Sequence, residues 1–379
     1  MHATAATTSI YERLGVQPVI NARGNNTVLG GSTPSPRVRQ AMLDAERYYV
    51  DMQQLLERSG EAIARLLGAE AAYVTPGAAA ALALGAAACM TGTDNARIAQ
   101  LPDVSGLKHR ILIQAGHHYH YEHAVTVPGA HLDEVGSQGR TTAQELESAL
   151  DSSVVAVLVP AHLDGAPGTV SLAEVREIAR ARQVPVLVDA AGRVYPVEKL
   201  RAYAREGGDL VAFGAKYLGA LNASGILCGR ADLVAAAACN SFMGFETVNW
   251  GATFGRPLKL DRQTIVAVVA ALEEWLETDH EARLAGYQRR LERMASALEG
   301  APGVSTRIVH DEGPSPRVLV ISPGAGARLD AAGLVQQLRD GQPAIAVVRN
   351  ASESISINPV TVREEDDAAM IDRLRELLL

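Results

Sequence analysis

Between residues 109 and 230 the chain alternates short apolar runs, rich in Val, Leu and Ile, with segments that have helical spacing. Two of these segments, "TAQELESAL" and "SLAEVREIARARQ", carry acidic residues near their beginnings. Apolar strands separated by helices are typical of a parallel sheet that is covered on both faces. In such a domain the functional site lies beyond the carboxyl ends of the strands. We expect strands at 109–115, 131–136, 153–161, 184–191, 209–215 and 224–230.

The pattern changes after Pro257. Residues 261–299 have the spacing of one long helical stretch, and a further helix begins at "REEDD" near the end of the sequence. Between these helices, short apolar runs lie near 304–309, 317–322, 344–349 and 353–357. This arrangement predicts a second, smaller α+β domain. The expected domains are an N-terminal segment lining the active site (1–45), a large domain (46–256) and a small C-terminal domain (257–379).

The charge and cysteine content argue against several classes of protein. The net charge is −8 and the Lys and Arg residues are spread along the chain, whereas a nucleic-acid-binding protein normally has a basic stripe. Cys89, Cys228 and Cys239 form no CxxC pair, which indicates reduced thiols and a cytoplasmic location. The nearly uncharged run 71–90 has the length of a membrane span. However, Thr75-Pro76-Gly77 interrupts it and alanine dominates the rest, so we expect a helix packed inside the protein.

Three features fall where a sheet of this kind places a site. Asp189 in "VDAAG" and Lys216 in "FGAKYLGA" each end an apolar strand, and a turn in "YVTPGAAAALALG" begins a helix of small residues. The free N–H groups at the start of a helix are suited to binding phosphate. Together these features match pyridoxal phosphate, which bonds to a lysine and pairs its ring nitrogen with a carboxylate. An Asp–Lys ion pair at the edge of the sheet is the alternative that these residues leave open.

Longer stretches carry a resemblance to a known family. They are "YERLGVQPVINARGNNTVLGGS", "GEAIARLLGAEAAYVTPGAAAALALGAAACMTG", "VPVLVDAAGRVYPVE", "GRPLKLDRQTIVAVVAALEEWLETDHEAR" and the terminal "REEDD". In these stretches the chain resembles the selenocysteine-synthase-like branch of the fold-type-I pyridoxal phosphate enzymes. That branch contains L-seryl-tRNA selenium transferase and D-glucosaminate-6-phosphate ammonia lyase. The resemblance implies an aspartate-aminotransferase-like α/β fold, with a three-layer α/β/α large domain, a smaller α+β C-terminal domain and pyridoxal 5'-phosphate as the cofactor.

The resemblance also implies a role for each candidate residue near the cofactor. Lys216 would form the Schiff base and act as the general base, and Asp189 would pair with the ring nitrogen. His117, in "IQAGHHYHYEH", falls where relatives place a residue over the cofactor ring. The amides expected to hold the phosphate are those of Gly77, Ala78 and Ala79.

Substrate-binding residues follow from the same resemblance. Arg349 in "IAVVRN" matches the small-domain arginine of fold-type-I enzymes, whose planar guanidinium can bind a substrate carboxylate through two hydrogen bonds. Arg256 and Lys259 in "GRPLK" would meet a phosphate or a distal acidic group. The glycine-rich opening "NARGNNTVLGG" would line the substrate entrance, with Asn21, Arg23 and Thr27 as candidates.

Around the expected phosphate site the chain departs from the family pattern. Where relatives often have Thr-Ser-Gly, this chain has Thr75-Pro76-Gly77, and a hydroxyl residue next to Lys216 is missing. We therefore expect the phosphate to depend on backbone N–H groups, or on Thr253 or Arg256 of a neighbouring subunit. Relatives of D-glucosaminate-6-phosphate ammonia lyase tend to carry His-Arg-Asn where this chain has His117-His118-Tyr119. We therefore expect the rim of the site to differ in this chain.

Two further clusters allow alternative interpretations. Four histidines lie within seven positions, at His117, His118, His120 and His123. A zinc site needs three or four converging ligands, and no cysteine or carboxylate pair completes a set, so we predict cofactor stacking and a polar rim rather than a metal. The aromatic-rich stretch "CNSFMGFETVNWGATFGRP" is expected at a subunit interface of a homodimer or higher homo-oligomer, with a core patch as the alternative.

The expected activity is that of a pyridoxal-phosphate-dependent enzyme acting on a small amino acid. With a leaving group on Cβ, α,β-elimination gives a 2-oxo acid and ammonia, and the resemblance to an ammonia lyase favours this outcome. Racemisation and transamination with the same cofactor are alternatives. Selenium transfer on seryl-tRNA is disfavoured by the acidic charge and by the lack of a tRNA-binding extension before the core. A non-catalytic cofactor-binding protein is disfavoured by the presence of both Lys216 and Asp189.

Overall fold

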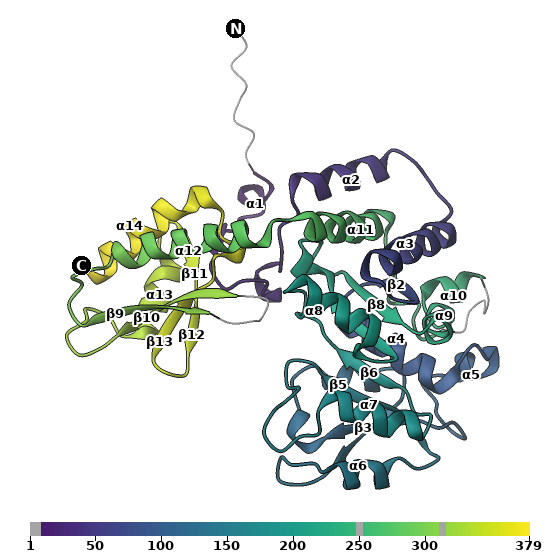
Figure 1. Ribbon diagram of the computed structural model, residues 1–379. Helices are drawn as coiled ribbons and strands as arrows, with labels where there is room; N and C mark the ends of the chain where they lie inside the picture. The colour runs from purple at the N-terminus through teal and green to yellow at the C-terminus, as the bar shows by residue number, and fades with distance from the viewer. Residues whose placement is uncertain (1–8, 248–252, 311–315) are drawn as a thin grey trace. The chain divides into compact units, whose positions relative to one another are not determined.

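The computed structural model describes residues 9–247, 253–310 and 316–379, and the chain forms two compact units (Figure 1). The larger unit comprises Ser32–Glu277, and the smaller unit combines Met1–Gly31 with Thr278–Leu379. Each unit has a hydrophobic core of its own. Among the described residues, no helix is both long enough and apolar enough to cross a membrane.

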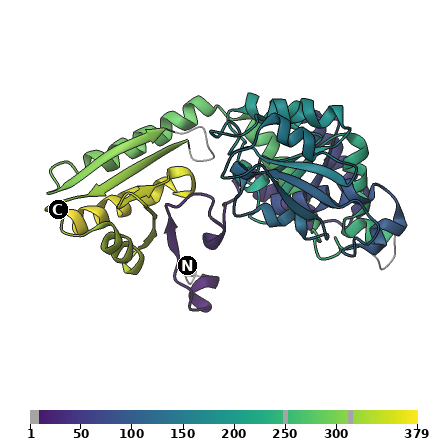
Figure 2. The ribbon, with the colours of Figure 1, turned by 90° about the horizontal axis from the view of Figure 1, so that it is seen from below.

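A seven-stranded mixed sheet, in the order β2-β8-β7-β6-β5-β3-β4, forms the centre of the larger unit. Five neighbouring strands, from β7 to β4, run parallel. Helices lie on both sides of the sheet (Figure 2), which explains why β5, β6 and β7 are apolar at nearly every position. The strands are β2 (Ala71–Thr75), β3 (Arg110–Gln114), β4 (His131–Val135), β5 (Val154–Pro160), β6 (Val186–Asp189), β7 (Leu210–Gly214) and β8 (Gly225–Gly229).

All six strands expected between residues 109 and 230 are present, but the expectation of a wholly parallel sheet is wrong for β8. This strand pairs antiparallel with both β7 and β2. A parallel connection needs a crossover of a dozen or more residues, usually a helix. Residues 215–224 are too few for such a crossover, so the chain turns back on itself after β7.

The alanine-rich run after β2 forms the buried helix α4 (Ala78–Thr91), which packs on strands β5 to β8. Small side chains permit this close approach, because a Cβ on Gly85 would lie 3.0 Å from Leu187 Cδ1. The other helices of this unit are α2 (Pro36–Glu46), α3 (Met52–Leu67), α5 (Asn95–Gln100), α6 (Ala143–Ala149), α7 (Leu172–Ala181), α8 (Val197–Ala202), α9 (Ala231–Cys239), α10 (Phe242–Thr247) and α11 (Arg262–Glu277).

The smaller unit contains a four-stranded antiparallel sheet in the order β12-β13-β10-β9 and a two-stranded parallel pair of β1 and β11. Its strands are β1 (Val19–Asn21), β9 (Val304–His310), β10 (Arg317–Pro323), β11 (Ala344–Ala346), β12 (Val348–Asn350) and β13 (Ser354–Ile357). Its helices are α1 (Ile10–Arg13), α12 (His280–Ser296), α13 (Ala331–Asp340) and α14 (Asp367–Leu378). β1 therefore joins the beginning of the chain to its C-terminal part.

The long helical stretch expected at 261–299 is divided into α11 and α12. Asp279 has an extended backbone and caps α12, because its side chain accepts a hydrogen bond from the N–H of Ala282. Helix α11 packs on α2 and α3 and so belongs to the larger unit. The compact units consequently divide the chain at 31/32 and 277/278, whereas the sequence placed domain boundaries at 45/46 and 256/257.

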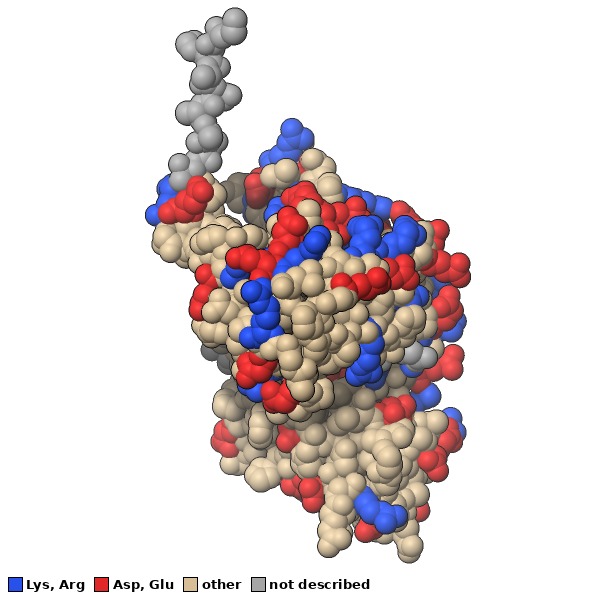
Figure 3. Space-filling model, turned by 90° about the vertical axis from the view of Figure 1, so that its left-hand side faces the viewer, with Lys and Arg blue, Asp and Glu red and all other residues tan. Residues whose placement is uncertain are grey.

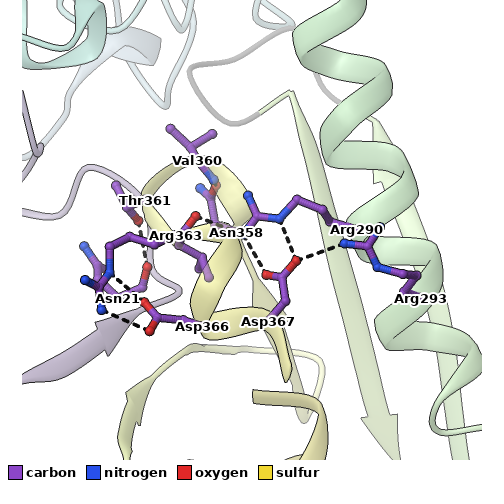
Figure 4. A network of polar contacts seen from close by, with 10 residues as sticks. Asn21, Arg290, Arg293, Asn358, Val360, Thr361, Arg363, Asp366 and Asp367 are labelled. Atoms are coloured by element: carbon purple, nitrogen blue, oxygen red, sulfur yellow. Dashed lines mark hydrogen bonds and ion pairs between the residues drawn. The ribbon is translucent and has the colours of Figure 1, made fainter. Parts of the chain in front are cut away.

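A buried ion pair fixes the loop that holds β1 in the smaller unit (Figure 4). Arg290 and Asp367 are 5% and 6% exposed, and hydrogen bonds of 2.8 and 2.7 Å join the guanidinium to the carboxylate. Arg290 also donates to the carbonyl of Val362 at 2.9 Å. The adjacent Thr361 hydroxyl donates to the carbonyl of Asn21 at 2.8 Å. The ion pair thus connects α12 and α14 to the strand that carries Asn21.

Replacing Asp367 by Asn should lower the free energy of unfolding of the smaller unit by about 3–5 kcal/mol, because it leaves the buried Arg290 guanidinium without its counter-charge. Urea unfolding followed by circular dichroism measures the change. The double variant Arg290→Met/Asp367→Leu should recover much of the loss, since it removes both charges. Glu61→Gln, which breaks the exposed Arg58–Glu61 pair, is the control and should change little. Equal unfolding midpoints for Asp367→Asn and the control would contradict this role.

Candidate active site

The carboxyl ends of six strands, all except β8, lie at one edge of the larger unit's sheet. Strand β2 runs in the same direction as β7, because both are antiparallel to β8. Strands β3, β4, β5 and β6 share that direction. Asp189 ends β6, and the turns after β2, β3, β5 and β7 carry Gly77, His117, His162 and Lys216. Four of these residues were predicted from the sequence, and the topology brings them to the same edge.

Asp189, the last residue of β6, is 6% exposed. Its Oδ1 accepts a hydrogen bond from the backbone N–H of Ala191 at 3.0 Å. Its Oδ2 accepts one from the hydroxyl of Tyr119 at 2.7 Å. A buried carboxylate requires such donors, and an ionised carboxylate has further lone pairs available for another donor. Asp189 is therefore placed to bind a cationic N–H group.

Lys216 lies in the short 3-10 helix η5 (Ala215–Leu218), directly after β7. Its Nζ is 5.3 Å from the centre of the Tyr217 ring. Burial lowers the pKa of Lys216 below the ordinary value for lysine. A lowered pKa increases the fraction of neutral amine, which is the form that reacts with an aldehyde. A lysine of this kind suits covalent attachment of a cofactor.

His117 is fully buried at the end of the 3-10 helix η2 (Ala115–His117), and burial lowers its pKa, so the imidazole is neutral at pH 7. Gln114 lies beside it, with 3.4 Å between Gln114 Nε2 and His117 Nδ1. The Gln114 amide is itself fixed by two hydrogen bonds to the backbone of Val170, of 2.9 and 2.7 Å. Gln114, the last residue of β3, was not predicted as a site residue, although it lies in the quoted stretch "IQAGHHYHYEH".

The phosphate cradle expected from the sequence corresponds to the turn between β2 and α4. Gly77 has a φ of 118°, which disfavours any residue with a Cβ, and no side chain caps the first turn of α4. The N–H groups of Ala78 and Ala79 are among those that a helix leaves unpaired at its start. Gly225, at the beginning of β8, packs against this turn: a Cβ there would lie 2.5 Å from the Gly77 carbonyl carbon and 2.9 Å from the Ala78 nitrogen. The cradle is thus formed by backbone in close contact.

Tyr119 and His162 also lie at this edge and were not among the predicted site residues. Their rings pack edge to face, with centres 5.2 Å apart. Burial lowers the pKa of His162, so this ring is neutral as well. Tyr119 occupies a position where the sequence comparison showed a departure from relatives, which was the one signal that could have drawn attention to it.

Most of the predicted substrate-binding residues lie in the smaller unit. The Asn21 side chain donates to the carbonyl of Gly24 and accepts from the N–H of Arg23, both at 3.0 Å. Arg23 has a buried Nε that lacks a hydrogen-bond partner among the described residues. Thr27 begins the exposed 3-10 helix η1 (Thr27–Leu29). Arg349 is exposed and donates to both carboxylate oxygens of Glu353, at 3.0 and 2.9 Å.

The region expected to border a neighbouring subunit is described only in part, since residues 248–252 lie outside the described residues. Thr253 donates from Oγ1 to the carbonyl of Ser241 at 3.2 Å. Arg256 lies 3.5 Å from the carboxylate of Glu246. Its guanidinium also lies over the ring of Phe245, 5.2 Å from the ring centre.

The histidine cluster does not converge on a point. His118 is held by two carboxylates, with its ring nitrogens 2.9 Å from oxygens of Glu122 and Glu134. His117 is buried, whereas His120 and His123 are exposed. Within the ranges that the structure describes, no group of three His, Cys, Asp or Glu residues is arranged to hold a metal ion.

The donor set at the edge of the sheet fits pyridoxal phosphate. The uncapped start of α4 offers N–H groups to a phosphate, Asp189 offers a carboxylate to the ring nitrogen, and Lys216 offers an amine to the aldehyde. A lysine and an aspartate after adjacent strands of a mixed sheet, with a separate α+β unit, define a fold-type-I pyridoxal-phosphate-dependent enzyme.

The particular family follows from comparison with known proteins. The sequence model of L-seryl-tRNA selenium transferase matches residues 19–301, and the chain belongs to this family. It is 34% identical to a 5'-C-glycyluridine monooxygenase-decarboxylase from a Streptomyces species, over 99% of this chain and 94% of the relative. It is 32% identical to the D-glucosaminate-6-phosphate ammonia lyase of Salmonella typhimurium, over 98% of each chain.

Solved structures agree with this assignment. A structure of D-glucosaminate-6-phosphate ammonia-lyase superposes with a TM-score of 0.86 at 31% identity, over 98% of both chains. The aspartate aminotransferase of Thermotoga maritima superposes with a TM-score of 0.51 at 15% identity, over 97% of this chain and 94% of that one. The second match confirms the aspartate-aminotransferase-like fold that the sequence predicted.

Gly225→Ala should weaken the affinity for pyridoxal phosphate by about tenfold or more, because the new Cβ displaces the backbone of Gly77 and Ala78. Cofactor uptake is measured by absorbance, and by mass mapping of the Lys216 peptide after borohydride reduction. Gly286→Ala is the matched control, since its Cβ meets just one atom, Arg289 NH2, at 4.0 Å. Unchanged affinity in Gly225→Ala would show that this turn does not hold the phosphate.

Proposed function

We propose that this chain binds pyridoxal 5'-phosphate at Lys216 and eliminates ammonia from a small 2-amino acid that carries a leaving group on Cβ. The observation that carries the proposal is the position of Asp189 and Lys216 at the ends of two adjacent parallel strands, in a fold that matches an ammonia lyase along nearly its whole length. The product is a 2-oxo acid. The family also includes selenium transferases that act on seryl-tRNA, for which the acidic chain offers less support.

The cofactor, when bound, stabilises the negative charge that develops at Cα. Lys216 would hold the cofactor, and its amine would act as the base that takes the Cα proton of the substrate. The Cβ leaving group departs with the electron pair of its bond. The released product takes up one water and gives the 2-oxo acid and ammonia. For a hydroxyl leaving group, the water lost balances the water taken up.

The other residues of the larger unit hold and orient the cofactor. The amides of Ala78 and Ala79, with the turn at Gly77, bind the phosphate. Asp189 would pair with the ring nitrogen, and the neutral His117 would lie over the ring. Because a side-chain hydroxyl is missing beside Lys216, we expect Thr253 or Arg256 of a neighbouring subunit to complete the phosphate site, so that the active form is a homodimer or a higher homo-oligomer.

Substrate recognition is proposed to involve Asn21, Arg23, Thr27 and Arg256, with Arg23 as the residue that binds the carboxylate. Arg349 was the sequence-based choice for this role. Its guanidinium is engaged by Glu353 at the surface, whereas the buried Nε of Arg23 has an unused donor. A buried donor without an acceptor is costly, and a substrate anion would supply the acceptor.

The charge distribution supports a small-molecule substrate. On the face shown in Figure 3, basic side chains alternate with acidic ones over the described residues. A nucleic-acid-binding face would instead concentrate Lys and Arg. The three cysteines are unpaired thiols, which supports placing the protein in the cytoplasm.

A panel of D- and L-2-amino acids with a 3-hydroxyl group, including D-glucosaminate 6-phosphate, tests the proposed reaction. We expect ammonia and a 2-oxo acid in equal amounts from at least one member, and none with Lys216→Ala. Recovery of the opposite enantiomer would indicate racemisation, and transfer of the amino group to a 2-oxo acid would indicate transamination. Oxygen uptake with release of carbon dioxide would indicate the reaction named for the Streptomyces relative. Any of these three in place of elimination would overturn the proposal.

With the amino acid that this panel identifies, Arg23→Ala should raise KM by about tenfold or more, as expected for the loss of a charge-assisted hydrogen bond. The absorbance of the bound cofactor should not change. Arg23→Lys should restore little, because an ammonium lacks the planar fork of a guanidinium. Arg349→Ala is the comparison variant. A large KM increase in Arg349→Ala, with wild-type kinetics in Arg23→Ala, would show that Arg349 binds the substrate carboxylate instead.

A further inference from the structure

Tyr119 donates a hydrogen bond to Asp189, the carboxylate proposed to pair with the ring nitrogen of the cofactor. The residue follows β3 and η2 in the chain, and Asp189 ends β6, so the contact links two separate strand ends. The Tyr119 hydroxyl lies 2.7 Å from Asp189 Oδ2, a distance typical of a strong hydrogen bond. The backbone of Ala191 donates to the other oxygen at 3.0 Å. Together the two donors fix the plane of the carboxylate.

The carboxylate of Glu122 holds the loop that carries Tyr119 in place. Glu122 Oε2 accepts a hydrogen bond from the Tyr119 backbone N–H at 3.0 Å and lies 2.9 Å from His118 Nδ1. The other His118 ring nitrogen lies 2.9 Å from Glu134, which is in β4. The Tyr119 ring packs edge to face on His162. The phenol is therefore positioned by its surroundings before any cofactor arrives.

In its contact with Asp189, the Tyr119 hydroxyl acts as the hydrogen-bond donor. Burial, together with the charge of Asp189, raises the pKa of Tyr119, so the hydroxyl stays protonated. A carboxylate oxygen has more than one acceptor site, so a ring N–H can bind Asp189 while both existing hydrogen bonds remain. Tyr119 thus holds the Asp189 carboxylate in one orientation.

We propose that Tyr119 is a positioning residue, whose hydroxyl holds the Asp189 carboxylate in one orientation and thereby strengthens its pairing with the ring nitrogen of the cofactor. The inference rests on the proposed function, because it concerns the same site. It gives Tyr119 a role beside those proposed for Lys216, Asp189, His117 and the turn at Gly77. The substitution that isolates it is Tyr119→Phe, which removes the hydroxyl and retains the ring that packs on His162.

The experiment compares two cofactors on the full-length chain after removal of its cofactor. One is pyridoxal phosphate, and the other is its carbocyclic analogue, in which C–H replaces the ring nitrogen. Both keep the aldehyde that reacts with Lys216 and the phosphate that binds at α4. Tyr119→Phe should weaken the affinity for pyridoxal phosphate by about tenfold, the size expected when a hydrogen bond to a carboxylate is lost. It should leave the affinity for the analogue unchanged, since the analogue has no nitrogen for Asp189 to bind.

Two further variants separate a positioning role from a structural one. Tyr121→Phe is the matched control, because Tyr121 is a neighbouring tyrosine that is 70% exposed, and both affinities should stay at the wild-type value. In an Asp189→Asn background, adding Tyr119→Phe should cause no further loss of pyridoxal phosphate affinity, because the two residues act through one contact. Melting temperatures verify that each variant is folded.

If Tyr119→Phe lowers the affinity for both cofactors equally, the substitution merely destabilises the loop that carries Tyr119. That result would overturn the inference. An unchanged affinity for pyridoxal phosphate would also overturn it, while leaving the proposed function intact. If the wild-type chain binds no pyridoxal phosphate at all, the proposed function fails and this inference fails with it.

Discussion

An ionised carboxylate can remain buried at the end of a strand when donors surround it, and Asp189 is the case on which the site depends. Its two donors come from the turn after β6 and from the loop after β3. The loop in turn is fixed by Glu122 and by the packing of Tyr119 on His162. The hydrogen bonds of one buried side chain therefore connect the end of β6 to the loop after β3.

The direction of β8 has a comparable effect on the phosphate cradle. Because β8 runs antiparallel to its neighbours, it begins, rather than ends, at the edge where the site lies. Its first residue, Gly225, faces the turn at Gly77 at a distance that admits no side chain. The cradle is made of closely packed backbone, which suits a chain that lacks hydroxyl residues at the usual positions.

Family membership fixes the cofactor chemistry more firmly than the reaction. The relatives named above include an ammonia lyase, a monooxygenase-decarboxylase and selenium transferases, all matched over long stretches of this chain. What they share is an enzyme scaffold on which different bonds of a substrate are broken. In this chain the groups that choose the bond are expected around Arg23, in a segment held by the Arg290–Asp367 ion pair through Thr361.

The sequence by itself determined the features that depend on local pattern or on the chemistry of single residues. Apolar runs of strand length gave the six strands between 109 and 230, and Lys216, Asp189 and the turn at Gly77 indicated the cofactor. Tertiary structure decided the rest: the reversal of β8, the membership of α11 in the larger unit, the ion pair that occupies Arg349, and the contact of Tyr119 with Asp189. The physical reason is that periodicity and residue type are local properties. Hydrogen bonds between side chains 70 residues apart exist solely because packing brings their strand ends together.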